Sequence, residues 1–532
     1  MQAGKGNSGT VLGTLAVGQF LMTLDTSVMN VSIATVAEDV GTTVSGIQTA
    51  ITLYALVMAM FMITGGKIGT LIGRRRAFAL GCVIYGCGSL TTSLAPGLGV
   101  LILGWSLLEG LGAVLIMPAI VALVAANFPQ DQRPRAYGLV ASAGAIAVAV
   151  GPLIGGLVTT YFSWRWVFAG EVLIVIAILL LARRIADAPP HRRPELDLVG
   201  TALSAAGLGL VVYAVLRSSS WGWVAPKPHT PALLGVSATI WLILAGGLVL
   251  RVFLAWERRR GTRGLEPLVD PAMLGNRQLR GGMTIFFFQF LLQAGLFFIV
   301  PLFLSVSLGL TALQTGVRLL PLSITLLIAA VGIPKAWPHA SPRRVVQWGL
   351  LALFGGLVAL LAALELGAGP EITTVPMLLA GLGIGSLASQ LGSVTVSAVP
   401  DERTGEVGGL QNTATNLGVS VGTALAGSVL IAALTTSFLQ GISQNPSVPP
   451  QVTSHAEVEL ASGAPFLSDV DLERALAATG LPPGTVSAIV QQNATARLQA
   501  LRAADAVLAA IAGLSLFFTR LIPNEQPARS DP

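Results

Sequence analysis

Long, almost uncharged apolar stretches recur along the whole chain, and no other feature restricts the fold as strongly. A helix that crosses a bilayer needs about 20 mostly apolar residues. Hydrophobic residues make up 53% of the 532 residues and charged residues only 11%, whereas soluble domains carry about 25% charged residues. The sequence therefore predicts an all-α polytopic membrane protein.

About fourteen of these stretches are long enough to span a membrane. We expect the first to be retained as a span, because no small-residue cleavage site follows a short apolar core, as it would in a signal peptide. The stretches lie near residues 11–35, 46–69, 77–96, 98–125, 136–160, 165–184, 200–216, 231–255, 281–306, 312–333, 345–367, 374–398, 407–436 and 500–521.

Most of the 31 lysines and arginines fall in alternate loops between the stretches, for example at 74–76, 192–193, 258–260, 343–344 and Arg403. Loops rich in Lys and Arg stay in the cytoplasm. We therefore expect an even number of spans with both termini cytoplasmic. The net charge of +6 then reflects topology, and no nucleic-acid partner is expected. The alanine-, glycine- and arginine-rich composition is typical of a GC-rich bacterium, so we expect the bacterial inner membrane.

The chain contains an internal repeat of short sequence patterns. The run from Gly65 to Arg76 follows the second stretch, and 332–335 with 341–344 follow the tenth. Similarly, Tyr137-Gly138-Leu139 opens the fifth stretch, and Gly408-Gly409-Leu410 opens the thirteenth. Duplicated halves are the architecture of rocking transporters, which place the substrate site at the midplane between the halves.

The repeat divides the chain into three predicted parts. Residues 1–185 form a six-helix bundle, 186–278 form cytoplasmic linkers and two inserted helices, and 279–532 form a second six-helix bundle. By the charge count, the long polar segment 437–499 lies outside the cell. Amphipathic pieces within it predict a small exposed helical cap, for which a passive connecting role is the simplest interpretation.

Five short motifs of this chain can be compared with known families: Leu24-Asp25-Thr26-Ser27-Val28-Met29-Asn30-Val31, Gly66 to Arg76, Gly151-Pro152-Leu153-Ile154-Gly155-Gly156, Ser163-Trp164-Arg165-Trp166-Val167-Phe168, and Leu310 to Gly316. Together they resemble the major facilitator superfamily, specifically its 14-helix drug:proton antiporters of the EmrB/QacA type, over nearly the whole chain. The resemblance implies drug export. It also implies conformational roles for a loop motif and a helix-five motif, comprising Gly66, Gly69, Gly73, Arg74 and Arg75, and Gly151, Pro152, Gly155 and Gly156.

The chain also departs from the family pattern. Thr70 stands where the loop motif normally has an acidic residue, and Leu71 where it has an arginine. In helix four, Ser106 replaces the arginine linked to proton coupling and Glu109 replaces a glutamine, while Glu171 of helix six stands where an asparagine is common. The route of proton coupling therefore cannot be carried over from the family.

Asp25 interrupts the first apolar stretch. A carboxylate in hydrocarbon is costly and usually faces a cavity or a partner. Met22 and Met29 share its helical face, with Asn30 adjacent, and soft methionines beside an acid suit varied lipophilic cations. Exclusion from water favours a protonated carboxyl, whereas a bound cation favours the carboxylate, so cation entry would expel a proton. Alternatively, Asp25 is structural and is hydrogen-bonded to neighbouring helices; we favour the functional interpretation.

Glu109 lies within the fourth stretch, with Trp105 one turn before it on the same face. An aromatic ring over a carboxylate could hold an organic cation. The alternative is a neutral glutamic acid hydrogen-bonded between helices. Glu171 is expected nearer a membrane edge, and its role is left open.

In the ninth stretch, Gln289 and Gln293 form a polar stripe on an aromatic helix. This stripe is a candidate cavity wall from the second half. Hydrogen bonding between helices explains it equally well.

We therefore predict secondary active efflux of small amphiphilic or cationic compounds, such as drugs and antibiotics, in exchange for protons, by a monomer in the lipid bilayer. One alternative is a narrow-specificity exporter of a metabolite, lipid or self-made antibiotic. Another is a non-transporting receptor or scaffold on a decayed transporter fold. No cofactor, metal site or enzymatic activity is expected, because the sequence has no nucleophile–base pair, metal-ligand spacing or phosphate loop.

Overall fold

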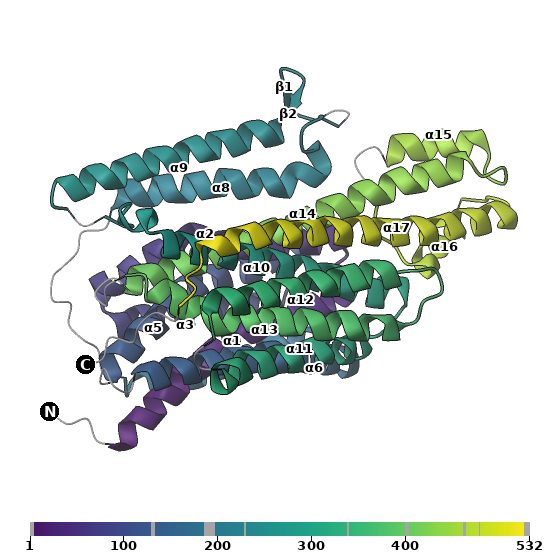
Figure 1. The fold of residues 1–532 in the computed structure, drawn as a ribbon. Helices are drawn as coiled ribbons and strands as arrows, with labels where there is room; N and C mark the ends of the chain where they lie inside the picture. Colours follow the sequence, from purple (N-terminus) through teal and green to yellow (C-terminus); the bar gives the residue numbers. More distant parts are fainter. Residues whose placement is uncertain are drawn as a thin grey trace.

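Helices make up almost all of the computed structural model, and most run roughly side by side along one axis (Figure 1). The structure describes residues 5–128, 133–185, 197–227, 230–265, 267–337, 340–399, 404–460, 464–477 and 479–525. Arg192, Arg193, Arg403 and part of the predicted linker at 186–196 lie outside the described residues.

The elements follow the predicted order of apolar stretches. The first part contains α1 (Lys5–Asp39), α2 (Val44–Ile72), α3 (Arg74–Ser93), α4 (Leu98–Leu101), the π-helix η1 (Ile102–Glu109), α5 (Gly110–Asn127), α6 (Arg133–Tyr161) and α7 (Arg165–Ala182). The inserted part contains α8 (Leu198–Trp221), β1 (Ala232–Leu233), β2 (Val236–Ser237) and α9 (Ala238–Thr262). The last part contains η2 (Met273–Gly275), α10 (Arg277–Leu302), η3 (Phe303–Ser307), α11 (Ala312–Ala336), α12 (Pro342–Ala363), η4 (Pro370–Thr373), α13 (Thr374–Val396), α14 (Thr404–Ser443), α15 (Pro450–Glu459), α16 (Asp469–Ala477), α17 (Pro483–Ser515) and η6 (Leu516–Leu521).

Twelve helices among the described residues are long and apolar enough to cross a membrane, which confirms a polytopic all-α membrane protein. One of these spans, Leu98–Val124, is built from α4, η1 and α5 in sequence. Two further helices, α3 and α6, pack inside the bundle but are not among the twelve; the stretch Val150–Tyr161 of α6 is apolar but shorter than a span. The predicted total of fourteen spans stays a prediction.

Each half of the chain packs largely on itself, and two helix pairs make most of the contacts between the halves. In the first half α1 packs on α6 and α3 packs on α5 and α7, while in the second half α10 and α17 pack on α14, and α12 packs on α13. These two pairs are α2 with α14 and α6 with α11, and α1 makes smaller contacts with α10 and α11. This arrangement agrees with the predicted two-half architecture, although the exact domain boundaries stay predictions.

The inserted hairpin of α8 and α9 lies along one side of the bundle (Figure 1), where α8 packs on both α2 and α14. Its second helix begins at Ala238, seven residues later than residue 231, where the sequence pattern placed the start of the span. The intervening residues form the antiparallel β1–β2 hairpin, whose turn needs positive φ angles at Leu234 and Gly235.

The segment predicted as an exposed helical cap is helical, but much of it extends the spans. Helix α14 continues to Ser443, and α17 begins at Pro483, so both project beyond the bundle together with α15 and α16 (Figure 1). Arg497 of α17 is almost fully buried and donates to the Leu467 carbonyl at 2.6 Å and to Asp469 at 2.7 Å. These bonds attach the segment before α16 to α17.

Candidate functional site

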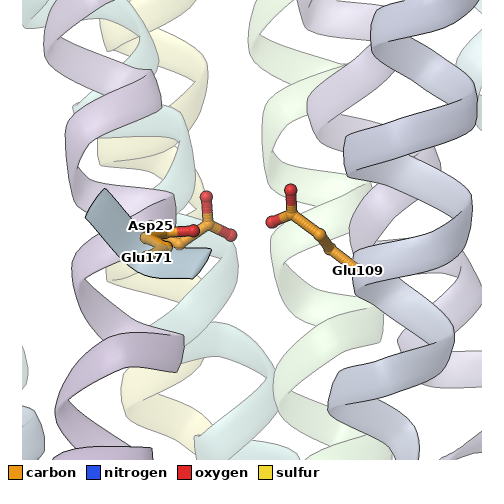
Figure 2. A group of neighbouring side chains, drawn as sticks. All are labelled: Asp25, Glu109 and Glu171. Atoms are coloured by element: carbon orange, nitrogen blue, oxygen red, sulfur yellow. The ribbon is translucent and has the colours of Figure 1, made fainter. Parts of the chain in front are cut away.

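Three carboxyl groups from three helices meet inside the first half. Asp25 of α1, Glu109 at the end of η1 and Glu171 of α7 each place a carboxylate oxygen within 4.8 Å of the others, and no more than 1% of any of these residues is exposed. Figure 2 shows Glu109 pointing across the gap between helices toward Asp25 and Glu171. The sequence predicted that Glu171 lies nearer a membrane edge. In the structure, its carboxyl group lies beside those of Asp25 and Glu109. We call these three residues the acid cluster.

Trp105 closes the Asp25 side of the acid cluster. Its indole N–H donates to both Asp25 oxygens, at 2.8 and 2.9 Å, and its ring stacks on Tyr54 of α2 with 5.2 Å between centroids and 5° between planes. The sequence placed Trp105 on the helical face of Glu109 as a candidate for holding an organic cation, and that role stays a prediction. Trp105 is fully buried, and it bonds Asp25.

Trp105 and Glu109 both belong to the π-helix η1, a conformation that is common at functional sites. Both side chains reach the acid cluster: Trp105 bonds Asp25, and a Glu109 oxygen lies within 4.8 Å of Asp25. Glu109 also accepts a hydrogen bond from Thr92 of α3 at 3.0 Å. The close approach of α3 requires Gly88, where a Cβ would lie 2.7 Å from the Glu109 backbone nitrogen.

Helix α3 also supplies the polar partners of the third acid. One oxygen of Glu171 accepts from the Tyr85 hydroxyl at 3.1 Å and from the Ser89 hydroxyl at 3.1 Å. Sequence reasoning missed Thr92, Tyr85 and Ser89. The hydroxyl-rich end of α3 was a weak signal for them, because isolated Ser and Thr are common in membrane helices.

Some carboxylate oxygens of the acid cluster accept no hydrogen bond from the described residues. Oε2 of Glu109 and Oε1 of Glu171 are buried without a partner among the described residues. Two full negative charges 4.8 Å apart repel by about 3.5 kcal/mol at an effective dielectric constant of about 20. Because no basic side chain pairs with these acids in the described part of the chain, three simultaneous charges would need protons or a cation to balance them.

A binding role stays a prediction for the other three residues expected beside Asp25. Met22 and Met29 are buried in the main apolar core. Asn30 donates to the Thr26 carbonyl of its own helix at 2.8 Å rather than to an acid.

The predicted glutamine stripe lies on α10, in the other half. Gln289 is buried with its Oε1 unpaired within the described chain, and Gln293 is half-buried. No hydrogen bond joins either glutamine to the acid cluster among the residues described.

The loop motif holds the first half together at the junction of α2 and α3. Gly73 adopts a φ of 99°, which favours glycine, and a Cβ at Gly66 would lie 3.6 Å from Pro118 of α5. Arg74 donates to the Ala122 carbonyl at 3.2 Å, and Arg75 to the Ile185 carbonyl at 3.3 Å. Gly69, also in this motif, is buried beside α3.

The helix-five motif lets α6 pack closely on two helices. A Cβ at Gly151 would collide with Ser27, and one at Gly155 would lie 2.9 Å from Val28, both on α1. On the other side, a Cβ at Gly156 would collide with the α11 backbone, and Gly316 of α11 lies against Pro152 in the same way. The Leu313 amide of α11 donates to Thr160 at 3.0 Å, which ties the two halves together at this end.

Two further buried acid sites escaped the sequence reasoning. Asp505 of α17 is fully buried, with both carboxylate oxygens unpaired among the described residues, and the rule that singled out Asp25 would have found it. Asp197, before α8, accepts from Trp256 at 2.9 Å and pairs with Arg260 at 3.2 Å, and these bonds join the ends of the inserted hairpin.

Known proteins with similar sequences align with most of this chain. The puromycin resistance protein of Streptomyces alboniger is 30% identical over 84% of this chain and 86% of its own length. The probable actinorhodin transporter of Streptomyces coelicolor is 28% identical over 86% and 78% of the two chains. The tetracenomycin C resistance and export protein of Streptomyces glaucescens is 26% identical over 99% and 95%.

Solved structures and a family model agree on the fold. A bacterial homologue of the human lysosomal transporter Spinster, in an inward-facing and unoccupied conformation, superposes with a TM-score of 0.62 at 14% identity and covers 98% of each chain. A peptide transporter solved with sulfate superposes with a TM-score of 0.58 at 15% identity and covers 96% of each chain. The model of the Major Facilitator Superfamily matches residues 15–423. The chain is therefore a membrane transporter that belongs to the Major Facilitator Superfamily.

Proposed function

We propose that this protein exports small amphiphilic or cationic compounds in exchange for protons. The observation that carries the proposal is the acid cluster, in which three carboxyl groups meet without a basic partner in the described chain. Buried ionisable groups inside membrane bundles typically mark ion and proton pathways. The names of the relatives, which refer to resistance and export, support the outward movement of drug-like molecules.

Exchange follows from charge balance in the acid cluster. When no cation is present, protons limit the repulsion between the carboxyl groups. A monovalent organic cation that reaches the cluster neutralises one carboxylate, so one proton leaves and the total charge stays constant. Asp25 would be the main site for the proton and the cation, with Glu109 as its partner. Asp25 is the acid that contacts Trp105, whose ring stacks on Tyr54, so movement of these two aromatic side chains would expose it first.

Access to Asp25 requires Trp105 to move. In this conformation, the indole occupies both Asp25 oxygens and Tyr54 covers the ring. We infer that rocking of the halves, hinged where the glycines of α6 meet α11, loosens this contact and admits the substrate. Alternation between two such states is how duplicated transporters expose one site to each side in turn.

The direct test is transport in proteoliposomes with an imposed pH gradient, run against a chemically diverse panel of organic cations, neutral amphiphiles and anions. We expect gradient-driven movement of the amphiphilic cations, with proton flux in the opposite direction. A rate of substrate transport that does not change with the imposed pH gradient would reject proton exchange. A complete lack of transport and of substrate-induced proton release would favour the receptor or scaffold alternative, which is motivated by Thr70 and Ser106.

A second candidate is a narrow exporter of one self-made antibiotic. The observation that favours it is that the puromycin, actinorhodin and tetracenomycin relatives are each named for a single compound. In a competition assay on the same vesicles, a broad exporter would be inhibited by many unrelated cations. A narrow exporter would be inhibited by one chemical scaffold.

The cellular setting is part of the proposal. We propose a monomer in the bacterial inner membrane with both termini in the cytoplasm, on the same side as the loop that contains Arg74 and Arg75. Reporter fusions at the two termini would test this orientation. An external location of either terminus would contradict it.

A further inference from the structure

A pocket of about 440 Å³ opens at one end of the second half, between α11, α12 and α13. It lies at the end that also carries the basic residues Lys335, Arg343 and Arg344. We call it the tryptophan pocket; its lining residues include Trp337, Ser341, Arg344, Trp348 and Ser386.

Hydrogen-bond donors without protein partners line the tryptophan pocket. Among the described residues, the Arg344 guanidinium and the indole N–H groups of Trp337 and Trp348 have no acceptor. The Ser341 hydroxyl accepts from the Arg344 backbone amide at 3.4 Å, so its own O–H remains available to donate. No acidic side chain is among the lining residues described. The pocket therefore offers one positive charge and several donors, a combination suited to a phosphate group.

An apolar surface leads from the pocket toward the middle of the spans. Trp337 is 66% exposed and Trp348 is 71% exposed, which is typical of tryptophans at the boundary between lipid and water. Leu351 is one turn beyond Trp348 on α12, and Leu382 is one turn from the pocket-lining Ser386 on α13. Both leucines are exposed within candidate membrane spans, so acyl chains would cover them.

We propose that the tryptophan pocket binds an anionic phospholipid. Its phosphate bonds the Arg344 guanidinium and the Ser341 hydroxyl, the two indoles lie at the level of the glycerol esters, and an acyl chain follows Leu351 and Leu382. Basic pockets between membrane helices bind anionic head groups in this way. A cationic substrate does not fit, because Arg344 would repel it. The proposal does not depend on the transport proposed for the acid cluster.

Native mass spectrometry of the delipidated full chain tests the proposal. Titration with phosphatidylglycerol should give one tightly retained lipid, and phosphatidylcholine should bind more weakly. Arg344→Gln should weaken phosphatidylglycerol binding about tenfold, the loss expected for one charge-assisted hydrogen bond. The matched control is Arg280→Gln, which removes an exposed arginine of α10 in the same half and should leave binding unchanged.

Trp348→Leu provides a second variant, which should weaken both lipids by removing the interfacial ring while keeping the charge. Equal retention of the two lipids by the wild type, or equal losses in the Arg344 and Arg280 variants, would overturn the proposal. Displacement of the lipid by inorganic phosphate at the same concentration would identify a free-phosphate site instead and would also overturn it. Displacement of the lipid by the cation tetraphenylphosphonium would identify a substrate site instead and would also overturn the proposal.

Discussion

Asp25→Asn removes a charge from the acid cluster while preserving most of its packing. The amide has nearly the same shape as the carboxylate, and its oxygen can still accept one of the two hydrogen bonds that Trp105 now donates. The main change is therefore electrostatic. If Asp25 binds the substrate cation, binding should weaken while the protein still folds and reaches the membrane.

The size of the effect follows from the spacing of the acid cluster. A cation held about as far from Asp25 as the other acids are, within 4.8 Å, gains about 3.5 kcal/mol from that charge at an effective dielectric constant of about 20. Since each 1.4 kcal/mol is a factor of about ten, the loss corresponds to an affinity about 300-fold lower. Equal occupancy of the site would then need a substrate concentration about 300-fold higher.

Binding of tetraphenylphosphonium to the purified protein in weakly buffered solution would measure both quantities, with a pH-indicator dye reporting the released proton. The wild type should release about one proton per bound cation, by the charge balance described above. Asp25→Asn should lose both signals. Glu365→Gln is a matched control, because it neutralises an exposed acid in the loop after α12 and should behave as the wild type. An Asp25→Asn affinity within about threefold of that control would remove Asp25 from the mechanism, because the calculated loss is about 300-fold.

Three further substitutions test separate parts of the structure. Trp105→Phe removes the indole N–H that is shared between the two Asp25 oxygens and should lower the free energy of unfolding of the purified protein by about 1–3 kcal/mol; an equal loss in an Asp25→Leu background, where no acceptor remains, would show that the bond does not matter. Gly156→Leu should abolish transport without lowering membrane abundance, since its side chain collides with α11, whereas Gly170→Leu, where a Cβ meets nothing within 4 Å, should transport normally. Asp505→Leu should raise the melting temperature, because a buried polar group without a partner costs about 1–3 kcal/mol; a lower melting temperature would indicate an unrecognised stabilising role.

The helical membrane fold was predictable from the sequence because bilayer thickness fixes the length of a span. The apolar runs identified the described spans, and the motifs predicted the family. The errors occurred where local geometry overrides composition. The pattern placed the start of the inserted second helix at residue 231, because it does not distinguish a short β-hairpin from the start of a helix. It placed the start of the last span at residue 500, although α17 already begins at Pro483.

The sequence singled out each acid of the site, but it did not predict that the three carboxyl groups lie close together. Asp25, Glu109 and Glu171 attract attention because each is costly within an apolar stretch. Their convergence depends on which helices are neighbours, and a single sequence does not contain that information. The contact between Trp105 and Asp25 likewise joins residues that lie 80 positions apart in the sequence. The functional roles of the acids stay predictions.

The position of the acid cluster constrains how the two halves can be coupled to it. All three acids belong to the first half, so a relative movement of the halves does not by itself change their surroundings. Helix α2 provides a connection, because its Tyr54 stacks on Trp105 while its Gln48 donates to the Thr423 carbonyl of α14 at 3.0 Å. A shift of α14 that pulls α2 would therefore act on Trp105, which bonds Asp25. Coupling through packed, hydrogen-bonded contacts needs an element with two arrangements, and the Tyr54–Trp105 stack is one such contact, because it can separate without breaking a helix.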